Sequence, residues 1–249
     1  MKPAYLLSIV ALLAAQTSLC AQEAAPAAVR VASVECSIIR KNSCNKFSKV
    51  VKGRFSYDAA AGAAAYEYDA PFLYRFIIND TAIVGIDTRR NAGYAARRST
   101  DLEGCDDLYA TIHFFDAYLR CVNADRETLT PAGCTESHWY YGRRNRSGTD
   151  ILGRSIETGA VDCIESFDEK GVMFQQLKAR FNEGRHTYDF PVRIVVRRKC
   201  GDMLTSDTVL ISAASVNRLV RGDAFTLPAG CELRPMEETR QGLFSAGQN

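Results

Sequence analysis

The chain has 249 residues, with 31 Lys or Arg against 29 Asp or Glu, so its formal net charge is only +2. Near-balanced charge, with basic residues in short pairs such as Arg143–Arg144, gives no support to nucleic-acid binding. After the N-terminal region no run of about 20 apolar residues occurs, so we predict no transmembrane helix.

The N-terminus is expected to direct export. Lys2 precedes an apolar run from Tyr5 to Ala15, which is too short to span a bilayer but has the length of a signal-peptide core. We expect residues 1–21 to be a signal peptide and residues 22–28 an Ala- and Pro-rich linker. One alternative is an N-terminal helix of the mature domain. Another is cleavage before Cys20, which would then carry lipid, although the bulky Leu19 does not favour that cut.

Alternating side chains at the start of the mature chain predict β-strands. We expect residues 29–39 and 47–57 to form a hairpin. Its second strand opens a run of four extended segments, from Gly53 to Asp87, with aromatic or aliphatic residues at every second position. This period of two is typical of a sheet with one apolar face, which another part of the protein must cover. The residues that share faces of the four segments are Phe55 and Tyr57; Tyr66 and Tyr68; Tyr74, Phe76 and Ile78; and Val84 and Ile86.

The rest of the chain is expected to add one helix and more strands. After an acidic start at Asp106, apolar residues recur at helical spacing through Phe115 and Leu119, which predicts a helix over residues 106–122. In all, about nine strands with short connections favour one large, curved, antiparallel sheet in a mainly β domain, with the helix against its concave face. The other expected segments are a polar loop at 88–100, an irregular cross-linked segment at 128–166, a turn at 167–171, strands at 173–181, 187–198 and 208–213, and a polar tail at 235–249.

The cysteine count agrees with export. Without Cys20 the chain has eight cysteines, and an even number in an exported protein predicts disulfides. Eight cysteines allow 105 pairings, of which Cys36 with Cys44 is the best local guess, because a turn-like segment separates them. A metal site is the alternative, but there is no C-x-x-C pair and the three His are scattered, so we expect no metal. The eight are Cys36, Cys44, Cys105, Cys121, Cys134, Cys163, Cys200 and Cys231.

No catalytic motif stands out in the sequence. It contains no G-x-S-x-G, no H-E-x-x-H and no phosphate-binding glycine loop. The paired carboxylates at Asp106–Asp107 are better explained as a helix start. We therefore expect a protein that is not an enzyme and needs no cofactor.

Two regions resemble the periplasmic lipoprotein-carrier family, which is LolA-like with LolB-like relatives. The resemblance covers roughly residues 53–87 and 166–233. The matching motifs are Gly53-x-Phe55; Tyr66-x-Tyr68-Asp69-Ala70-Pro71; Tyr74 to Ile78, Asn79-Asp80 and Ile83 to Asp87; Phe167-Asp168-x-x-Gly171; Tyr188-Asp189-Phe190-Pro191; and Phe225-Thr226-Leu227-Pro228-x-Gly230.

The resemblance implies an incomplete β-barrel, with helices in its opening around an apolar cavity. It implies a single domain over residues 29–234, with a cysteine-rich insertion at about residues 100–165. The implied function is to bind the acyl chains of lipoproteins or other lipids in the periplasm and deliver them toward the outer membrane. Partners would be an inner-membrane release complex and an outer-membrane acceptor, and we expect a monomer. The expected cavity residues are Phe55, Tyr57, Tyr66, Tyr68, Tyr74, Phe76, Ile78, Phe190, Val192 and Ile194.

Three alternatives remain open at this point. The same apolar residues could form a closed core packed by the helix. The domain could be an envelope sensor or protein-interaction module, with Trp139, Tyr140 and Tyr141 beside Arg143 and Arg144 as its contact surface. If Cys20 is lipidated, the protein would be a membrane-anchored acceptor of lipoproteins.

Overall fold

The computed structural model describes residues 30–44, 47–97, 114–145, 148–182, 190–200 and 203–235. The predicted signal peptide and linker, Cys20, Cys105, Tyr188 and the tail beyond residue 235 lie outside these ranges, as does the first half of the predicted helix.

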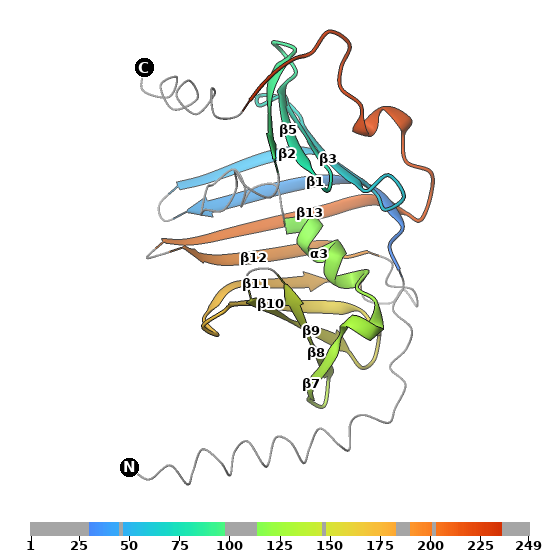
Figure 1. Cartoon of the computed structure of the whole chain (residues 1–249), viewed down its shortest axis with the longest axis vertical. Coiled ribbons are helices and arrows are strands. Elements are labelled where there is room, and N and C mark those ends of the chain that lie inside the picture. The colour runs from blue at the N-terminus through green and yellow to red at the C-terminus, as the bar shows by residue number, and fades with distance from the viewer. Residues whose placement is uncertain are drawn as a thin grey trace. The chain divides into compact units, whose positions relative to one another are not determined.

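In this part of the chain, fourteen strands form one open sheet that is not closed into a barrel (Figure 1). The strand order is β14-β6-β5-β4-β3-β2-β1-β13-β12-β11-β10-β9-β8-β7. Pairs from β1 to β6 and from β7 to β12 are antiparallel, whereas β14 runs parallel to β6. The elements are β1 (Ser33–Cys44), β2 (Phe47–Asp58), β3 (Ala63–Tyr68), β4 (Tyr74–Ile78), β5 (Ala82–Asp87), β6 (Ala92–Arg97), α3 (Phe114–Val122), η1 (Arg126–Thr128), β7 (Thr130–Cys134), β8 (His138–Asn145), β9 (Gly148–Ser155), β10 (Val161–Asp168), β11 (Met173–Arg180), β12 (Arg193–Cys200), β13 (Met203–Val216), η2 (Gly222–Phe225) and β14 (Glu232–Pro235).

The mainly β fold is confirmed, and two local predictions are wrong. Residues 88–100 contain strand β6 rather than only a loop, and residues 128–166 form strands β7 to β10 rather than an irregular segment. These strands lack clear alternation because Gly, Arg and Pro interrupt their apolar pattern. Pairing with neighbouring strands stabilises the extended conformation that their own sequences do not favour.

The chain divides into two compact units, which are described separately. Unit 1 comprises Met1–Arg30 and Ala117–Asp207, and unit 2 comprises Val31–Asp116 and Thr208–Asn249. The single domain expected over residues 29–234 stays a prediction.

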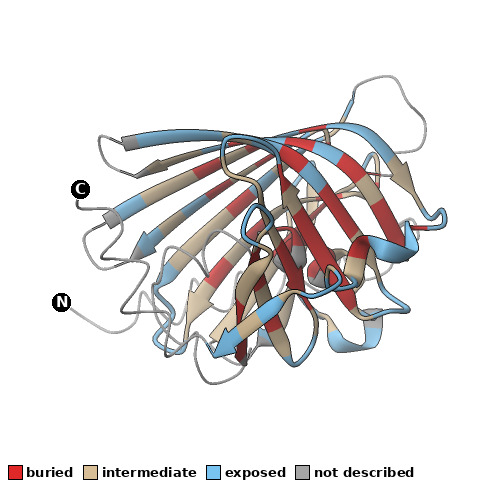
Figure 2. Cartoon of the chain, turned by 90° about the horizontal axis from the view of Figure 1, so that it is seen from above, coloured by how far each residue is buried: buried red, intermediate tan, exposed pale blue. Residues whose placement is uncertain are grey.

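Unit 2 buries an aromatic face built from consecutive hairpins. The predicted hairpin of β1 and β2 is confirmed, with Cys36 opposite Phe55. Phe55 in turn lies opposite Tyr66, and Tyr66 opposite Phe76, so these side chains form a row across β2, β3 and β4. Directly paired residues share a face of the sheet. Figure 2 shows the buried positions of the sheet in red, and in β3 and β4 no residue is exposed.

The opposite face of β3 to β5 is apolar as well, which corrects the expectation of one apolar face. Val84 pairs with Ile77, and Ile86 pairs with Arg75, so Val84 and Ile86 point away from Phe76. Ile83 pairs with Ile78 and lies on the aromatic face instead. Ile77 and Ile86 are nevertheless buried, and residues 221–224 of the C-terminal segment lie against this second face at β3 and β4.

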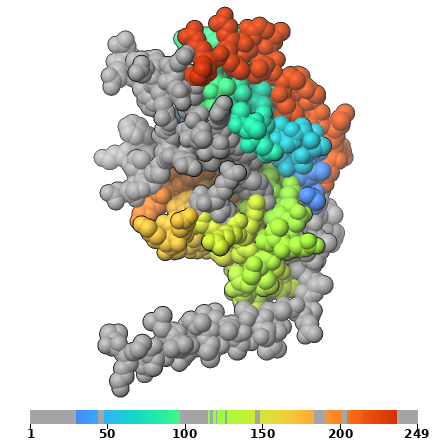
Figure 3. All heavy atoms as spheres, in the orientation of Figure 1, coloured from blue at the N-terminus to red at the C-terminus, as the bar shows by residue number. Residues whose placement is uncertain are grey.

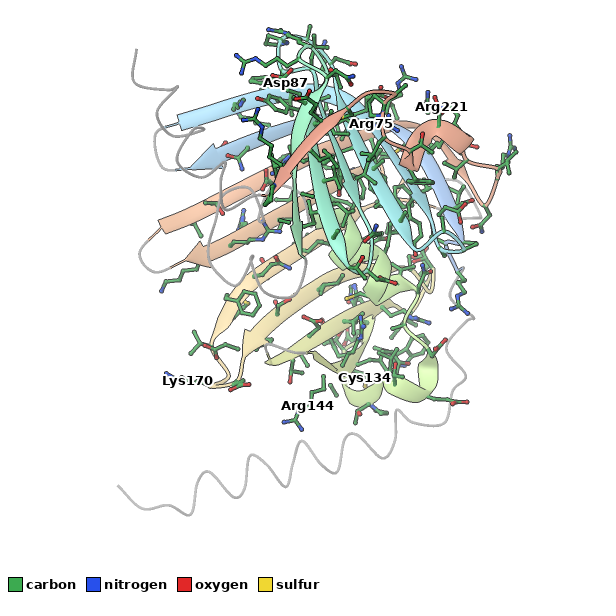
Figure 4. The ribbon with its side chains drawn as sticks, turned by 45° about the horizontal axis from the view of Figure 1, so that its top comes forward. Arg75, Asp87, Cys134, Arg144, Lys170 and Arg221 are labelled. Atoms are coloured by element: carbon green, nitrogen blue, oxygen red, sulfur yellow. The ribbon has the colours of Figure 1, made fainter. Side chains whose placement is uncertain are left out.

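That C-terminal segment is held by charged side chains. Arg75 donates to the carbonyl oxygens of Asp223 and Ala224, the latter at 2.6 Å. Arg221 lies 3.2 Å from Glu35 and 3.5 Å from Glu67. Figure 4 shows Arg75 and Arg221 beside the ribbon of this segment, and Figure 3 shows the segment in orange and red next to the strands of unit 2. The sheet of unit 2 is therefore covered on both faces around β3 and β4, whereas the second face of β2 is exposed at Val50.

Unit 1 has an apolar row bounded by a polar one. Leu152, Ile164, Leu177 and Val196 are paired in register across β9 to β12, and all four are buried. The adjoining row carries hydrogen-bonded pairs, from Ser166 to Asp150 at 2.7 Å and from Arg198 to Gln175 at 2.6 Å. One end of the buried face of unit 1 is thus polar, and these polar side chains are hydrogen-bonded to each other.

The predicted turn at residues 167–171 is confirmed between β10 and β11. Asp168 accepts hydrogen bonds from the backbone amides of Lys170 and Val172, and Gly171 has φ of 76°. This is the conformation that glycine adopts without strain.

The cysteines differ from the expectation of disulfides throughout. Cys134 is disulfide-bonded, whereas Cys36, Cys163 and Cys231 carry free thiols. The Cys36–Cys44 pairing is wrong, because both residues lie on strand β1. Eight residues of extended chain separate their Cα atoms by roughly 26 Å, and a disulfide needs less than about 7 Å.

Candidate functional site

The aromatic face of unit 2 is the best candidate for a hydrophobic binding site. We define it as Phe55, Tyr66, Tyr68, Tyr74, Phe76 and Ile78, with the half-buried Tyr57 at its edge. Its rings form a continuous wall. Ring centroids are 4.9 Å apart for Phe55 and Tyr66, 6.3 Å for Tyr66 and Tyr68, 6.1 Å for Tyr68 and Phe76, and 6.3 Å for Tyr74 and Phe76.

A side chain of the protein's own helix covers this wall. Phe115 of α3 stacks on Phe55 with a centroid distance of 4.3 Å and lies 6.2 Å from Tyr66. Phe55 and Tyr66 are both 0% exposed. For these two residues the structure therefore corresponds to the closed core that the sequence left open as an alternative.

The rest of the aromatic face is less uniformly enclosed. Phe76 and Tyr68 are each 6% exposed and Ile78 is 1% exposed, whereas Tyr57 and Tyr74 are half-buried. Tyr74 is the first residue of strand β4. It therefore forms the rim of the aromatic face.

The three remaining predicted residues belong to unit 1. Ile194 is buried on β12 and Phe190 is 9% exposed, while Val192 is half-buried. The ring of Tyr118, on α3, meets Phe190 edge-on at 6.2 Å, and its hydroxyl donates to the carbonyl of Val161. The ten expected cavity residues thus fall into two groups, one in each unit, and a residue of α3 contacts each group.

Strand β1 contributes residues that the sequence analysis did not assign to the site. Val34, Cys36, Ile38 and Arg40 lie on the aromatic face, because each pairs with a residue on that side of β2. All four are buried. The alternation of these residues along the sequence could have predicted their place on the aromatic face, but the charged Arg40 interrupts the apolar pattern.

One end of the aromatic face carries positive charge. Arg40 is only 2% exposed, and its guanidinium donates to the Tyr68 hydroxyl at 3.4 Å. Lys49 lies on the same side of β2, with its Nζ 3.8 Å above the ring of Phe72. Burial, with a smaller contribution from the charge of Arg40, lowers the pKa of Lys49. This end of the face therefore has two cations beside an aromatic wall.

Metal chemistry has no support among the described residues. They contain no group of three or more His, Cys, Asp or Glu that could hold an ion. His138 is within 2.9 Å of both carboxylate oxygens of Asp162, and its other ring nitrogen is 2.8 Å from the Ser137 hydroxyl. This chain of hydrogen bonds links β8 to β10, which are not neighbours in the sheet.

The aromatic triplet on β8 does not form the contact surface expected for a sensor. Trp139 and Tyr141 lie on one face of the strand and Tyr140 on the other, since strand residues alternate. All three are half-buried by pairing with β7 and β9. Of the predicted surface, which also includes Arg143 and Arg144, only the Arg144 side chain is exposed to solvent.

No helix in the described ranges is long and apolar enough to cross a membrane. The sequence matches no family model and no curated protein.

Solved structures nevertheless resemble this chain in fold. A LolA superfamily protein from Nitrosomonas europaea matches with a TM-score of 0.53 at 9% identity, over 87% of this chain and 96% of that chain. A DUF1329 family protein from Desulfovibrio piger matches with 0.57 at 8% identity, over 86% and 94%. A domain assigned to an outer membrane lipoprotein-sorting protein from Vibrio parahaemolyticus matches with 0.56 at 9% identity, over 78% and 89%. At these identities the likeness establishes the fold alone, and the fold is LolA-like.

Proposed function

We propose that the protein is a periplasmic binding or carrier protein for the acyl chains of lipoproteins or other lipids, which it delivers toward the outer membrane. The observation that carries this proposal is the continuous aromatic face of unit 2, which Phe115 of a nine-residue helix covers. A helix of this length is marginal without tertiary contacts, so it is a suitable element to move aside. The LolA-like fold supports the same proposal.

The energetics fit a carrier that transfers its cargo directly. Each buried methylene is worth about 0.8 kcal/mol, so a long acyl chain contributes on the order of 10 kcal/mol. Free dissociation would be slow, and transfer into an acceptor's site is the expected route. The acyl chain would lie along Phe55, Tyr66 and Phe76, with its polar end toward Arg40 and Lys49.

The disulfide at Cys134 supports a location outside the cytoplasm. Cys134 is disulfide-bonded, and stable disulfides are typical of oxidising compartments. Together with the predicted signal peptide, this favours the periplasm, with an inner-membrane release complex and an outer-membrane acceptor as partners. Determination of the mature N-terminus by mass spectrometry would test cleavage after Ala21 against lipidation of Cys20.

Native mass spectrometry of protein purified from an envelope fraction tests the carrier function. Co-purifying lipid or lipopeptide is the expected result. A protein that is free of lipid, and that takes up no fatty acyl probe from solution, would contradict the proposal. The aromatic face would then be a closed core that only stabilises the fold.

Substitutions locate the binding face. Phe76→Glu places a charge on the aromatic face and should abolish uptake of an acyl probe, while Tyr74→Glu does the same at the half-buried rim with less risk to folding. Val50→Glu is the matched control, because Val50 is 53% exposed on the other face of β2. Equal loss in Val50→Glu, or normal uptake in a folded Tyr74→Glu, would show that the acyl chain does not bind here.

A further inference from the structure

One face of the pair β11–β12 in unit 1 carries an unusual concentration of positive charge. The register places Arg180 opposite Arg193, Lys178 opposite Val195 and Gln176 opposite Arg197. These residues alternate with the buried Leu177, Ile194 and Val196, so they lie on the other side of the sheet. We call this surface the β11–β12 cation face. Its charged members are Lys178, Arg180, Arg193, Arg197 and Lys199, and all five are exposed.

Acidic side chains do not balance this face within the two strands. Neither MFQQLKAR of β11 nor RIVVRRKC of β12 contains Asp or Glu. On the neighbouring strand β10, Glu165 shares the face but accepts a hydrogen bond from the Gln176 amide at 2.9 Å. Five cations on two strands stand out in a chain whose formal net charge is only +2.

The arrangement costs stability locally. Like charges repel each other, and Arg193, Arg197 and Lys199 lie on the same face of β12. Local rules of this kind are broken mainly at functional sites. The five cations are therefore better explained by a partner of opposite charge than by the fold.

We propose that the β11–β12 cation face docks the protein on the surface of an anionic lipid membrane. Exposed Lys and Arg near such a surface each strengthen binding about fivefold. No aromatic side chain lies between the cations of β12, where only Val195 separates Arg193 from Arg197, whereas single-stranded nucleic acids are bound by bases that stack on aromatic rings. Exposed aliphatic residues border the same strands, with Leu204 of β13 at 60% and Met173 of β11 at 44% exposure. Such side chains suit the boundary between lipid headgroups and acyl chains.

This docking surface goes beyond the proposed carrier function and does not depend on it. Acyl binding uses the aromatic face of unit 2, whereas docking uses exposed cations of unit 1. Tyr74→Glu should lose acyl uptake and keep vesicle binding, and loss of the cation face should do the reverse. The two proposals can therefore fail separately.

The test is co-sedimentation of the full chain with two kinds of vesicle, phosphatidylcholine alone and phosphatidylcholine containing phosphatidylglycerol. We expect binding only to the anionic vesicles, weakening steeply as salt shortens the Debye length below about 10 Å. The triple substitution Lys178→Gln, Arg193→Gln, Arg197→Gln should weaken binding on the order of 100-fold. Its folding should be intact, because all three side chains are exposed.

The matched control removes three exposed cations from other places, by Arg144→Gln, Lys170→Gln and Arg218→Gln. Figure 4 shows Arg144 and Lys170 projecting away from the ribbon of unit 1. The control has the same net charge as the triple variant and should bind like the unaltered protein. Equal weakening in both triples, equal binding to neutral vesicles, or no binding to anionic vesicles would each overturn the proposal.

Discussion

The rings of Phe55 on β2 and Phe115 on α3 are stacked, with centroids 4.3 Å apart and planes 14° from parallel. The contact joins the centre of the aromatic face to Phe115, the residue that covers it. Since Phe55 and Phe115 are both 0% exposed, the state described by the structure is the closed one. Any acyl chain that binds at Phe55 must first displace Phe115.

Removing the cover should cost stability and open the site. Phe115→Ala is expected to lower the free energy of unfolding by about 3–5 kcal/mol, measured by urea denaturation. It should also increase the binding of an environment-sensitive acyl probe. A double-mutant cycle with Phe55→Ala should give a coupling of about 0.5–1.5 kcal/mol. Strictly additive effects would mean that the stacked pair does not hold α3 in place.

The C-terminal segment should depend on Arg75. Arg75→Met removes the donors to the carbonyls of Asp223 and Ala224 and should destabilise the protein by about 1.5–3 kcal/mol, since these are hydrogen bonds from a charged group. Faster proteolysis of residues 217–231 would report local opening. Arg218→Met is the control, because Arg218 is exposed in the same segment. If both variants are cut at the same rate, Arg75 does not secure the segment.

The Cys36 thiol should make stability fall in alkali. Burial, with a smaller effect of Glu35, raises the pKa of Cys36 from 9.0 to about 12. Between these values the unfolded chain loses a proton that the folded protein keeps. The contribution of Cys36 is therefore complete below pH 9 and is lost as the pH rises toward 12, by about 1.4 kcal/mol per unit.

Comparison with Cys36→Ala isolates this effect from the raised pKa values of Tyr94 and Tyr118, which act in the same direction. The stability difference between the two proteins should be constant below pH 9 and should shrink above it. In the folded protein the thiol should resist modification by an aromatic disulfide reagent. Rapid modification of Cys36 at neutral pH would show that β1 is not buried as described.

Gly85 on β5 should not tolerate a side chain. A Cβ atom there would lie 2.5 Å from the ring of Tyr94, its partner on β6. Gly85→Ala should therefore destabilise the protein by about 1–3 kcal/mol through overpacking. Gly142→Ala on β8 is the control, because its nearest contact would be an ordinary 3.7 Å. Its effect should stay within about 0.5 kcal/mol. Similar losses in the two variants would show that the ring of Tyr94 does not pack on Gly85.

Much of unit 2 followed from alternation alone. The hairpin of β1 and β2 and the strands from Gly53 to Asp87 appear as expected, because each pairs with its immediate neighbour in sequence. The burial of Phe55, Tyr66 and Phe76 could be predicted from the sequence for the same reason. The expectation of one apolar face failed at Ile86, since alternation does not reveal that a distant segment, residues 221–224, lies against the second face.

The sequence by itself determined that this is a mainly β protein with an aromatic sheet face, because a period of two is a property of the local backbone. Only the tertiary structure decided what lies on that face. Stacking of Phe115 on Phe55 joins residues 60 positions apart, and the opposition of Arg180 and Arg193 depends on the register of two strands. No local sequence pattern predicts either contact, because both arise from pairing and packing between segments that are separated along the chain.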